Sequence, residues 1–378
     1  IPLNHPISVT VPGAVAGWIE LSKKYGNLKI EEILNLGIEL CHEGFEINEE
    51  LYNSLNLHKE ELSGQASGYG FYRDNQPFET GKMIRRPQLG KTLELLKRNG
   101  LEYFYDSDIT KSISSSVNGI LSYDDLKNFK AEWKKPLHSK IYGFDGWTSP
   151  PSTQGYLTLS TLKAIEMLGA EHDDLHRVIE TYRIFAADRD NITYDYGKNI
   201  KDFKGVDLDY IQEKIKLFNP NHSEKFDFPK PRGGGTAYMN TVDKNGLGVS
   251  LIQSNFHGIG SRIGVGSFGF FLHNRGCGFN LDSGHPNYLT PGRKPLHTLS
   301  PTIWSKNGNL EFIAGTRGGR YQPQLLIQTI LPYIQKSDSF EEIIKEPRWV
   351  IENFSNDTLS KLRFCLLYTS PSPRDMSA

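Results

Sequence analysis

The 378-residue chain has few cysteines, no excess of either charge and no long apolar run. Its cysteines, Cys41, Cys277 and Cys365, show no CxxC spacing, which argues against a disulfide framework or a structural zinc site. Because 43 Lys and Arg balance 44 Asp and Glu, the chain lacks the basic surface that nucleic acids or anionic membranes attract. No stretch approaches the roughly 18 apolar residues of a spanning helix. We therefore expect a small-molecule partner, no nucleic-acid partner and no membrane segment.

Both ends of the chain look unlike those of a complete gene product. Ile1 stands where an initiator Met or a signal would, so we expect N-terminal sequence to be missing. The stretch Cys365–Asp375, CLLYTSPSPRD, can be reverse-translated codon for codon into a sequencing-library adapter. We expect residues 365–378 to be an artefact of cloning or assembly, the alternative being a natural Ser/Pro-rich tail. A genomic read carrying these codons in place would decide for the tail.

The first two thirds of the chain carry helical patterns. Pro87 near a start, leucines at helical spacing and Gly100 as a stop predict an amphipathic helix between them. Tyr156–Leu168 has a nearly continuous apolar face, and a further stripe runs from Leu175 to near Asp190. These stripes predict core-facing helices.

The composition of the sequence changes after residue 218. Asn219–Arg232 is polar and Pro-rich, runs into three glycines and predicts an exposed loop where a chain can be cut without unfolding its neighbours. The pattern of apolar residues then changes to the two-residue alternation that is typical of strands. Thr236–Val242 and Val249–Ser254 flank an Asn-Gly turn, which predicts a hairpin.

A second hairpin is predicted by Ser300–Trp304 and Leu310–Ala314, which flank Asn307-Gly308. The run Gln324–Leu331 follows as a helix, and we expect Pro332 to stop it.

Thr236 opens a strand directly behind a Gly-rich loop, as an N-terminal nucleophile must. Its hydroxyl can attack a carbonyl once its own freed α-amine serves as the base, because such an amine titrates near pH 7.7–8.0. Gly235 has no side chain to block attack on its own carbonyl, so self-cleavage is sterically possible. The plain alternative is a structural Thr at a strand start.

The turn Gly315–Gly319, GTRGG, lies between a predicted strand and a predicted helix. Backbone N–H groups at such a turn can stabilise an oxyanion on a carbonyl under attack. The alternative is a simple tight turn.

Two further motifs imitate other sites. Residues 264–269 match GxGxxG, but no helix start follows, so we expect a Gly-rich loop and no dinucleotide. Residues 172–176, HDDLH, have Asp in place of the catalytic Glu of HExxH and predict a solvated helix start. We expect no cofactor and no metal.

Taken together, seven segments resemble the gamma-glutamyltranspeptidase superfamily over nearly the whole chain up to about Trp349. They are VPGAVAGW (Val11–Trp18), RRPQLGKTL (Arg85–Leu93), SYDDL (Ser122–Leu126), ETYRIFAADRD (Glu180–Asp190), GGTAYMNTVDKNG (Gly234–Gly246), SGHPNYLTPGRKPLHTLSPT (Ser283–Thr302) and GTRGGRYQPQ (Gly315–Gln324).

The resemblance implies an α/β fold, the four-layer αββα sandwich of N-terminal-nucleophile hydrolases, and a precursor that cuts itself into two associated subunits. Residues 1–235 would then belong to the large subunit, N-terminally truncated, and residues 236–364 to the small one. By position, Thr236 is similar to the nucleophile, Gly318 and Gly319 to the oxyanion hole, and Ser254 to the hydroxyl that supports the nucleophile.

The resemblance weakens at the glutamate pocket. The family holds the glutamyl α-amine and α-carboxylate with an amide, an acidic residue and a Ser-Ser pair, where this chain has Arg275, Gly278 and His297-Thr298. The family's Asn two residues beyond the supporting hydroxyl is Phe256 here, with Asn255 displaced by one. The chain is more similar to the acylase-like branch, and its candidate substrate contacts are Asn255, Arg275, His297 and Thr298, with ordinary loop packing as the alternative.

Three functional hypotheses follow. The first is an autoprocessing amidohydrolase or acyltransferase that forms an acyl-enzyme on Thr236. The second is a glutathione hydrolase or gamma-glutamyl transpeptidase with a rearranged pocket. The third is an inactive, unprocessed fragment.

Overall fold

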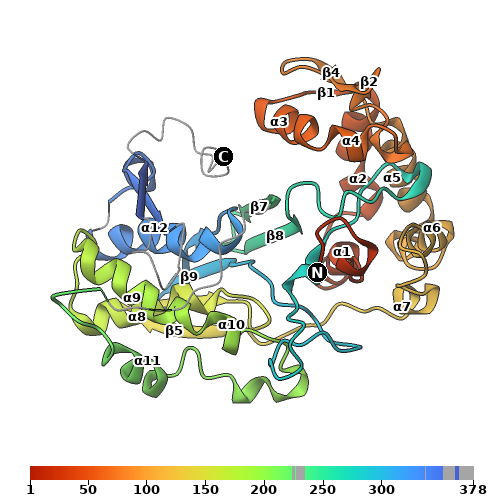
Figure 1. The fold of residues 1–378 in the computed structure, drawn as a ribbon. Helices are drawn as coiled ribbons and strands as arrows, with labels where there is room; N and C mark the ends of the chain where they lie inside the picture. The colour runs from red at the N-terminus through yellow and green to blue at the C-terminus, as the bar shows by residue number, and fades with distance from the viewer. Residues whose placement is uncertain (224–225, 227–234, 337, 352–361, 366–378) are drawn as a thin grey trace. The chain divides into compact units, whose positions relative to one another are not determined.

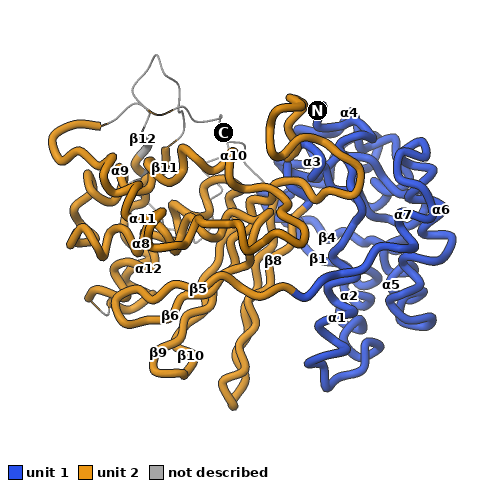
Figure 2. Tube along the Cα trace, turned by 90° about the horizontal axis from the view of Figure 1, so that it is seen from below, with its two compact units in different colours: residues 1–133, 255–277 blue, residues 134–254, 278–378 orange. Residues whose placement is uncertain are grey.

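A computed structural model describes residues 1–223, 226, 235–336, 338–351 and 362–365 (Figure 1). Most of the tail expected to be foreign, and residues 227–234 ahead of the predicted cut, lie outside the described residues. The chain divides into two compact units, residues 1–133 with 255–277 and residues 134–254 with 278–378 (Figure 2). Within the described ranges, every helix is too short or too polar to cross a membrane.

Unit 1 is mainly helical, with two small two-stranded ladders, β1 with β4 and β2 with β3. Its helices and strands are α1 (Ala14–Tyr25), α2 (Ile30–Glu43), β1 (Phe45–Glu46), α3 (Glu49–Leu57), α4 (Lys59–Leu62), β2 (Tyr72–Arg73), β3 (Gln76–Pro77), β4 (Met83–Ile84), α5 (Pro87–Asn99), α6 (Asp108–Ser116) and α7 (Tyr123–Lys127). Short 3₁₀ turns span Pro6–Ser8, Ala66–Gly68, Leu101–Phe104, Gly266–Phe268 and Arg275–Gly278, whose last residue counts with unit 2.

Helix α5 confirms the first predicted helix. It begins at Pro87, whose missing N–H costs nothing in a first turn, and ends before Gly100, which takes φ of 87°. Helix α5 packs against α2, and Leu96 lies in a core that also buries Ile109 and Ile113 of α6.

Unit 2 contains the main sheet, an antiparallel array in the order β10-β9-β6-β5. Its strands are β5 (Leu137–Ile141), β6 (Phe144–Thr148), β7 (Gly235–Val242), β8 (Gly248–Phe256, whose last two residues count with unit 1), β9 (Thr302–Lys306), β10 (Asn309–Ala314), β11 (Arg348–Ile351) and β12 (Leu362–Cys365). Asn307 and Gly308 join β9 to β10 with φ of 52° and 83°, the two left-handed residues of a type I′ turn.

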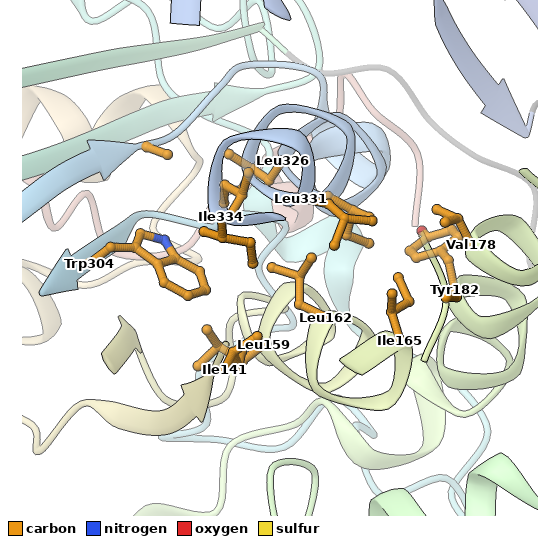
Figure 3. Close-up of a cluster of buried hydrophobic side chains, with 14 of the residues drawn as sticks. Ile141, Leu159, Leu162, Ile165, Val178, Tyr182, Trp304, Leu326, Leu331 and Ile334 are labelled. Atoms are coloured by element: carbon orange, nitrogen blue, oxygen red, sulfur yellow. The ribbon is translucent and has the colours of Figure 1, made fainter. Parts of the chain in front are cut away.

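Helices lie on one side of this sheet, some against its face and others packed on those helices. They are α8 (Tyr156–Leu168), α9 (Leu175–Ala187), α10 (Arg189–Ile192), α11 (Leu208–Ile215), α12 (Gln322–Lys336) and α13 (Phe340–Ile343), with 3₁₀ turns at Gly197–Asp202 and Gly319–Tyr321. Figure 3 shows the core between them: Trp304 of β9 points toward Leu159 and Leu162 of α8, beneath Leu326 and Ile334 of α12. Helix α8 has the predicted bounds, and the stripe predicted from Leu175 forms α9, followed by α10.

The hairpin β7–β8 packs on the other face of the sheet. A Cβ at Gly248 would lie 2.7 Å from Leu310 Cδ2 and 2.8 Å from Ile313 Cδ1, so β8 runs very close to β10. Unit 2 therefore stacks helices, a four-stranded sheet and a second, two-stranded layer.

Several predicted boundaries differ from the structure, and two of these differences have a clear physical cause. Pro332 does not stop its helix, because α12 continues to Lys336 and buries Leu331 and Ile334 in the core. That packing outweighs the roughly 3 kcal/mol that an interior proline costs. Strand β9 begins at Thr302 rather than Ser300, since Pro301 has no N–H to give to the ladder.

The GxGxxG-like and HExxH-like segments have the loop and the helix start that the sequence predicts for them. Residues 264–269 form a loop containing one 3₁₀ turn. In the HDDLH segment, the Asp174 carboxylate accepts a hydrogen bond from the Arg177 N–H at 3.2 Å and caps the start of α9.

Candidate active site

The hairpin β7–β8 brings Thr236 and Ser254 together. The Thr236 hydroxyl donates to Ser254 Oγ at 3.1 Å, and the Ser254 hydroxyl donates to the Gly235 carbonyl oxygen at 2.7 Å. That carbonyl belongs to the peptide bond that joins Gly235 to Thr236. The Ser254 hydroxyl thus accepts a hydrogen bond from the side chain of the candidate nucleophile and donates one to the carbonyl beside it, which polarises that carbonyl.

Local sequence explains why these groups meet. Strand β7 begins at Gly235, so the candidate bond lies inside the first residues of a paired strand. The Asp243–Leu247 turn closes with a 3.0 Å hydrogen bond between the Asp243 N–H and the Leu247 carbonyl, with Gly246 at φ of 82°. This turn returns β8 beside β7 and carries Ser254 to the level of Thr236. Both side chains are half-buried.

Tyr238 connects the hairpin to the GTRGG turn. Its hydroxyl lies 3.0 Å from Ser250 Oγ on the neighbouring strand, and burial raises the pKa of its phenol. The ring lies so close to Gly315 that a Cβ there would be 2.1 Å from Tyr238 Cε2. Only glycine fits at Gly315, and this contact places the start of the turn beside β7.

The GTRGG turn joins β10 to α12, as predicted. Gly318 and Gly319 take φ of 121° and 56°, which residues with a Cβ rarely adopt. Successive residues in such a turn can present neighbouring N–H groups to one point, as an oxyanion site requires. The geometry of Gly318 and Gly319 is therefore compatible with the role that the sequence predicts.

Sequence reasoning missed Gln154, which lies between β6 and α8 and is completely buried. Its Nε2 donates to the Thr298 carbonyl at 2.8 Å and to the Gly319 carbonyl at 2.9 Å. Two segments that the sequence singled out separately are thus joined by one side chain. No periodic pattern in the sequence singles out such a residue, and the surrounding residues, PSTQG, indicate only a turn.

Buried charges lie behind Gln154. Arg189 Nη1 donates to Gln154 Oε1 at 3.4 Å, and Arg189 Nε donates to Asp190 Oδ1 at 2.8 Å. Asp190 also accepts from Arg320 Nη2 at 3.4 Å. Burial alone would raise the pKa of Asp190, but the positive charges of Arg189 and Arg320 outweigh it and hold that pKa below the usual value.

His297 and Thr298 are held by the segment that leads into α8. The His297 N–H donates to the Ser152 carbonyl at 2.7 Å, and His297 forms a parallel bridge with Thr153. Thr298 is buried, and its carbonyl accepts from Gln154. Both residues therefore have firmly placed backbones.

Asn255 and Arg275 belong to unit 1 and are described there. Asn255 is exposed, and its carbonyl accepts from the Asn274 N–H at 3.2 Å. Arg275 is buried, its guanidinium lies 4.0 Å from the centre of the Phe256 ring, and burial lowers its pKa to about 9. Phe256 has φ of 77°, a strained conformation for a bulky residue.

Acidic, histidine and cysteine side chains form no group of three or more that could bind a metal ion anywhere in the described ranges. Asp190 faces two arginines and offers no cation site.

Comparisons with known proteins give consistent matches. The family model described as gamma-glutamyltranspeptidase matches residues 1–361. The glutathione hydrolase-like YwrD proenzyme of Bacillus subtilis is 29% identical, over 93% of this chain and 69% of its own length. The oxamate amidohydrolase proenzyme of Klebsiella pneumoniae is also 29% identical, with coverage of 93% and 69%.

A solved structure, that of cephalosporin acylase from Bacillus halodurans, superposes with a TM-score of 0.82 at 27% identity, over 92% of this chain and 67% of that one. The chain thus spans about two thirds of the length of the proteins it matches.

Proposed function

The chain belongs to the gamma-glutamyltranspeptidase family of enzymes, and from that membership we propose that it cuts itself between Gly235 and Thr236 and then hydrolyses or transfers an acyl group through Thr236. The fold shared with the acylase confirms the predicted α/β class and the αββα sandwich of N-terminal-nucleophile hydrolases. Both curated relatives are named proenzymes, which supports a precursor that is processed. The finer assignment depends on the hairpin.

One observation carries the proposal: Ser254 Oγ lies within hydrogen-bonding distance of both Thr236 Oγ1 and the Gly235 carbonyl oxygen. A structural threonine at a strand start needs no hydroxyl that also contacts the preceding carbonyl. A self-cleaving bond needs both contacts, because the nucleophile must lose a proton while the carbonyl oxygen gains negative charge.

Self-cleavage proceeds in two steps. Thr236 Oγ1 attacks the Gly235 carbonyl carbon, the C–N bond breaks, and the hydroxyl proton passes by way of Ser254 to the departing nitrogen. The product is an ester between Gly235 and Thr236 with a free α-amine. Water then hydrolyses the ester, leaving the Gly235 carboxylate and restoring the Thr236 hydroxyl.

The exposed threonine then acts on substrate. Its α-amine takes the hydroxyl proton while Oγ1 attacks an amide carbonyl, and the N–H groups of Gly318 and Gly319 stabilise the oxyanion. The amine product leaves with that proton. Water or an acceptor amine releases the acyl group. Residues 1–235 and 236–364 would remain associated as large and small subunits.

The proposed substrate is a small-molecule amide. The relatives are named for different amides, so the family alone does not choose one. We assign substrate contacts to Asn255, Arg275, His297 and Thr298. A guanidinium with a pKa of about 9 stays protonated at neutral pH, so Arg275 favours an anionic or carbonyl-rich acyl group.

The experiment is mass analysis of the purified full-length gene product. We expect two fragments, one of which begins at Thr236. A full-length protein that hydrolyses amides while its chain stays intact would contradict the proposal. An intact and inactive protein would support the third hypothesis, a fold without activity.

A second candidate activity is glutathione hydrolysis or transpeptidation, which the name of the YwrD relative favours. The two activities differ in the acyl group, so gamma-glutamyl p-nitroanilide and a simple acyl p-nitroanilide separate them. Faster cleavage of the simple anilide supports the acylase-like function. Faster cleavage of the glutamyl anilide, with transfer to an added dipeptide, supports the alternative.

A further inference from the structure

Gln154 is a buried residue that has no role in the chemistry proposed above. It follows β6 and comes two residues before α8, fully buried. Both of its amide hydrogens go to backbone carbonyls, that of Thr298 in the candidate substrate segment and that of Gly319 in the oxyanion turn. These carbonyls are 21 residues apart in sequence, and a single side chain holds both.

The partners fix the orientation of the amide. A glutamine amide offers two donor hydrogens on nitrogen and an accepting oxygen. The two carbonyls can only accept, and the Arg189 guanidinium, 3.4 Å from Gln154 Oε1, can only donate. A flipped amide would set oxygen against oxygen and nitrogen against guanidinium, so one orientation alone satisfies all three contacts.

The hydrogen bonds that begin at Gln154 form a ring that returns to the oxyanion turn. From Gln154 it passes to Arg189, then to Asp190, and from Asp190 to Arg320, the residue that follows Gly319. Arg189 is buried, so its charge depends on Asp190 for compensation. The oxyanion turn is therefore held at Gly319 and again at the next residue, by parts of one network.

The backbone beside Gln154 strengthens the same connection. The His297 N–H donates to the Ser152 carbonyl at 2.7 Å. Residues 152–154 thus hold residues 297–298 through a backbone contact and a side-chain contact. Gly318 and Gly319 have no Cβ to limit their conformations, so a buried donor on the Gly319 carbonyl restricts a turn that would otherwise be loose.

We propose that Gln154 is a positioning residue that couples the oxyanion turn to the substrate segment, and that Arg189 keeps its amide correctly oriented. The inference rests on the proposed function, since it assigns Gly319 to the oxyanion. Gln154 does not touch the reacting atoms. It sets where the Gly319 N–H lies relative to Thr298.

The test compares two glutamines in the full-length protein. Gln154→Met keeps the side-chain length and removes both donors. Gln335→Met is the matched control, because Gln335 Nε2 also donates twice, to the Ala170 carbonyl at 2.8 Å and to Tyr142 Oη at 2.9 Å, and neither acceptor belongs to residues 297–298 or 318–319. Processing, melting temperature, kcat and KM are measured for both variants on the anilide that the wild type cleaves.

We expect Gln154→Met to be processed, to lose roughly tenfold to a hundredfold in kcat, and to show a raised KM, because the Gly319 N–H and the Thr298 segment shift together. Gln335→Met should lower the melting temperature with kcat and KM unchanged. A merely structural loss at Gln154 would reduce the folded fraction and leave KM as it was.

Unchanged kcat and KM in folded, processed Gln154→Met would overturn the inference, as would equal kinetic losses in both variants. If Gln154→Met does not fold, Arg189→Lys gives the answer, because lysine keeps the charge beside Asp190 but loses the guanidinium contact to Oε1. Unchanged kinetics in Arg189→Lys would then count against it.

Failure of the proposed function looks different. A wild-type protein that stays uncut and inactive removes the proposed function and the role of Gln154 with it. A wild type that processes itself but cleaves neither anilide contradicts the proposed substrate turnover but not the self-cleavage. The role assigned to Gln154 then fails together with the turnover.

Discussion

The hydroxyl of Ser254 donates to the carbonyl oxygen of Gly235 at 2.7 Å, across the hairpin and beside Thr236. The proposed function depends on this contact, because a structural threonine at a strand start would not need it. It is made between side chain and backbone on neighbouring strands. Changing either hydroxyl therefore tests the chemistry with little change to the fold.

Thr236→Ala should leave the precursor uncut and lower amide hydrolysis by more than roughly a thousandfold, because the attacking oxygen is gone. Thr236→Ser is the control, since it keeps a hydroxyl on the same backbone, and we expect it to be processed. Denaturing gels and intact mass give the answer. Normal cutting in the alanine variant would rule out Thr236.

Ser254→Ala should slow processing roughly a hundredfold, because the Gly235 carbonyl loses its donor and Thr236 its acceptor. Ser250→Ala is a matched control on the same strand. Its hydroxyl contacts Tyr238 rather than the cleavage bond, so we expect normal processing and a stability loss of about 1 kcal/mol. Time courses of cleavage after synthesis measure both. Equal rates in the two variants would remove Ser254 from the mechanism.

Gly315→Ala should lower the free energy of unfolding by about 1–3 kcal/mol, because the new methyl group would collide with the Tyr238 ring. Gly17→Ala in α1 is the control. Nothing lies within 4 Å of a Cβ there, and alanine favours a helix, so stability should rise by roughly 0.5–1 kcal/mol. Urea unfolding followed by fluorescence compares them. If Gly315→Ala is as stable as the wild type, the turn does not lie against Tyr238.

Acid should destabilise unit 1 through His273. Burial, assisted by the charge of Arg275, lowers the pKa of this imidazole to about 4 from its usual 6.5. A lowered pKa means that the stability is fully present above pH 6.5 and is lost as the pH falls toward 4. The loss is on the order of 3 kcal/mol once protonation is complete.

The measurement is the urea midpoint of unit 1 at pH values between 7 and 4. His273→Gln cannot titrate, so its midpoint should fall less with acid than that of the wild type. His222→Gln, at an exposed position, should follow the wild type. Identical acid profiles for His273→Gln and the wild type would show that this imidazole is not the cause.

Sequence alone predicted the elements whose signal is local. Helix α8 has its predicted bounds because its apolar face repeats without interruption, and β7 and β8 follow from alternation around an Asn-Gly turn. Pro332 misled because its local preference conflicts with the burial of Leu331 and Ile334, which depends on distant strands.

The candidate site was predicted in part for the same reason. Thr236 and the GTRGG turn stand out in their own segments, and the resemblance added Ser254. Gln154 connects segments more than a hundred residues away, through backbone carbonyls that every residue possesses. Such contacts produce no characteristic residue spacing in the sequence. Arg189 and Asp190 stood within a recognised motif, but only the fold places their charges behind Gln154.

The hairpin β7–β8 also determines how maturation would depend on concentration. The attacking hydroxyl, its helper and the carbonyl all come from two adjoining strands of one molecule. Under the proposed self-cleavage none has to be delivered by an encounter with another copy, so we expect dilution to leave the half-time of maturation unchanged. If the chain cuts itself in this way, maturation would begin once the hairpin has formed, and its rate would not depend on the concentration of the chain.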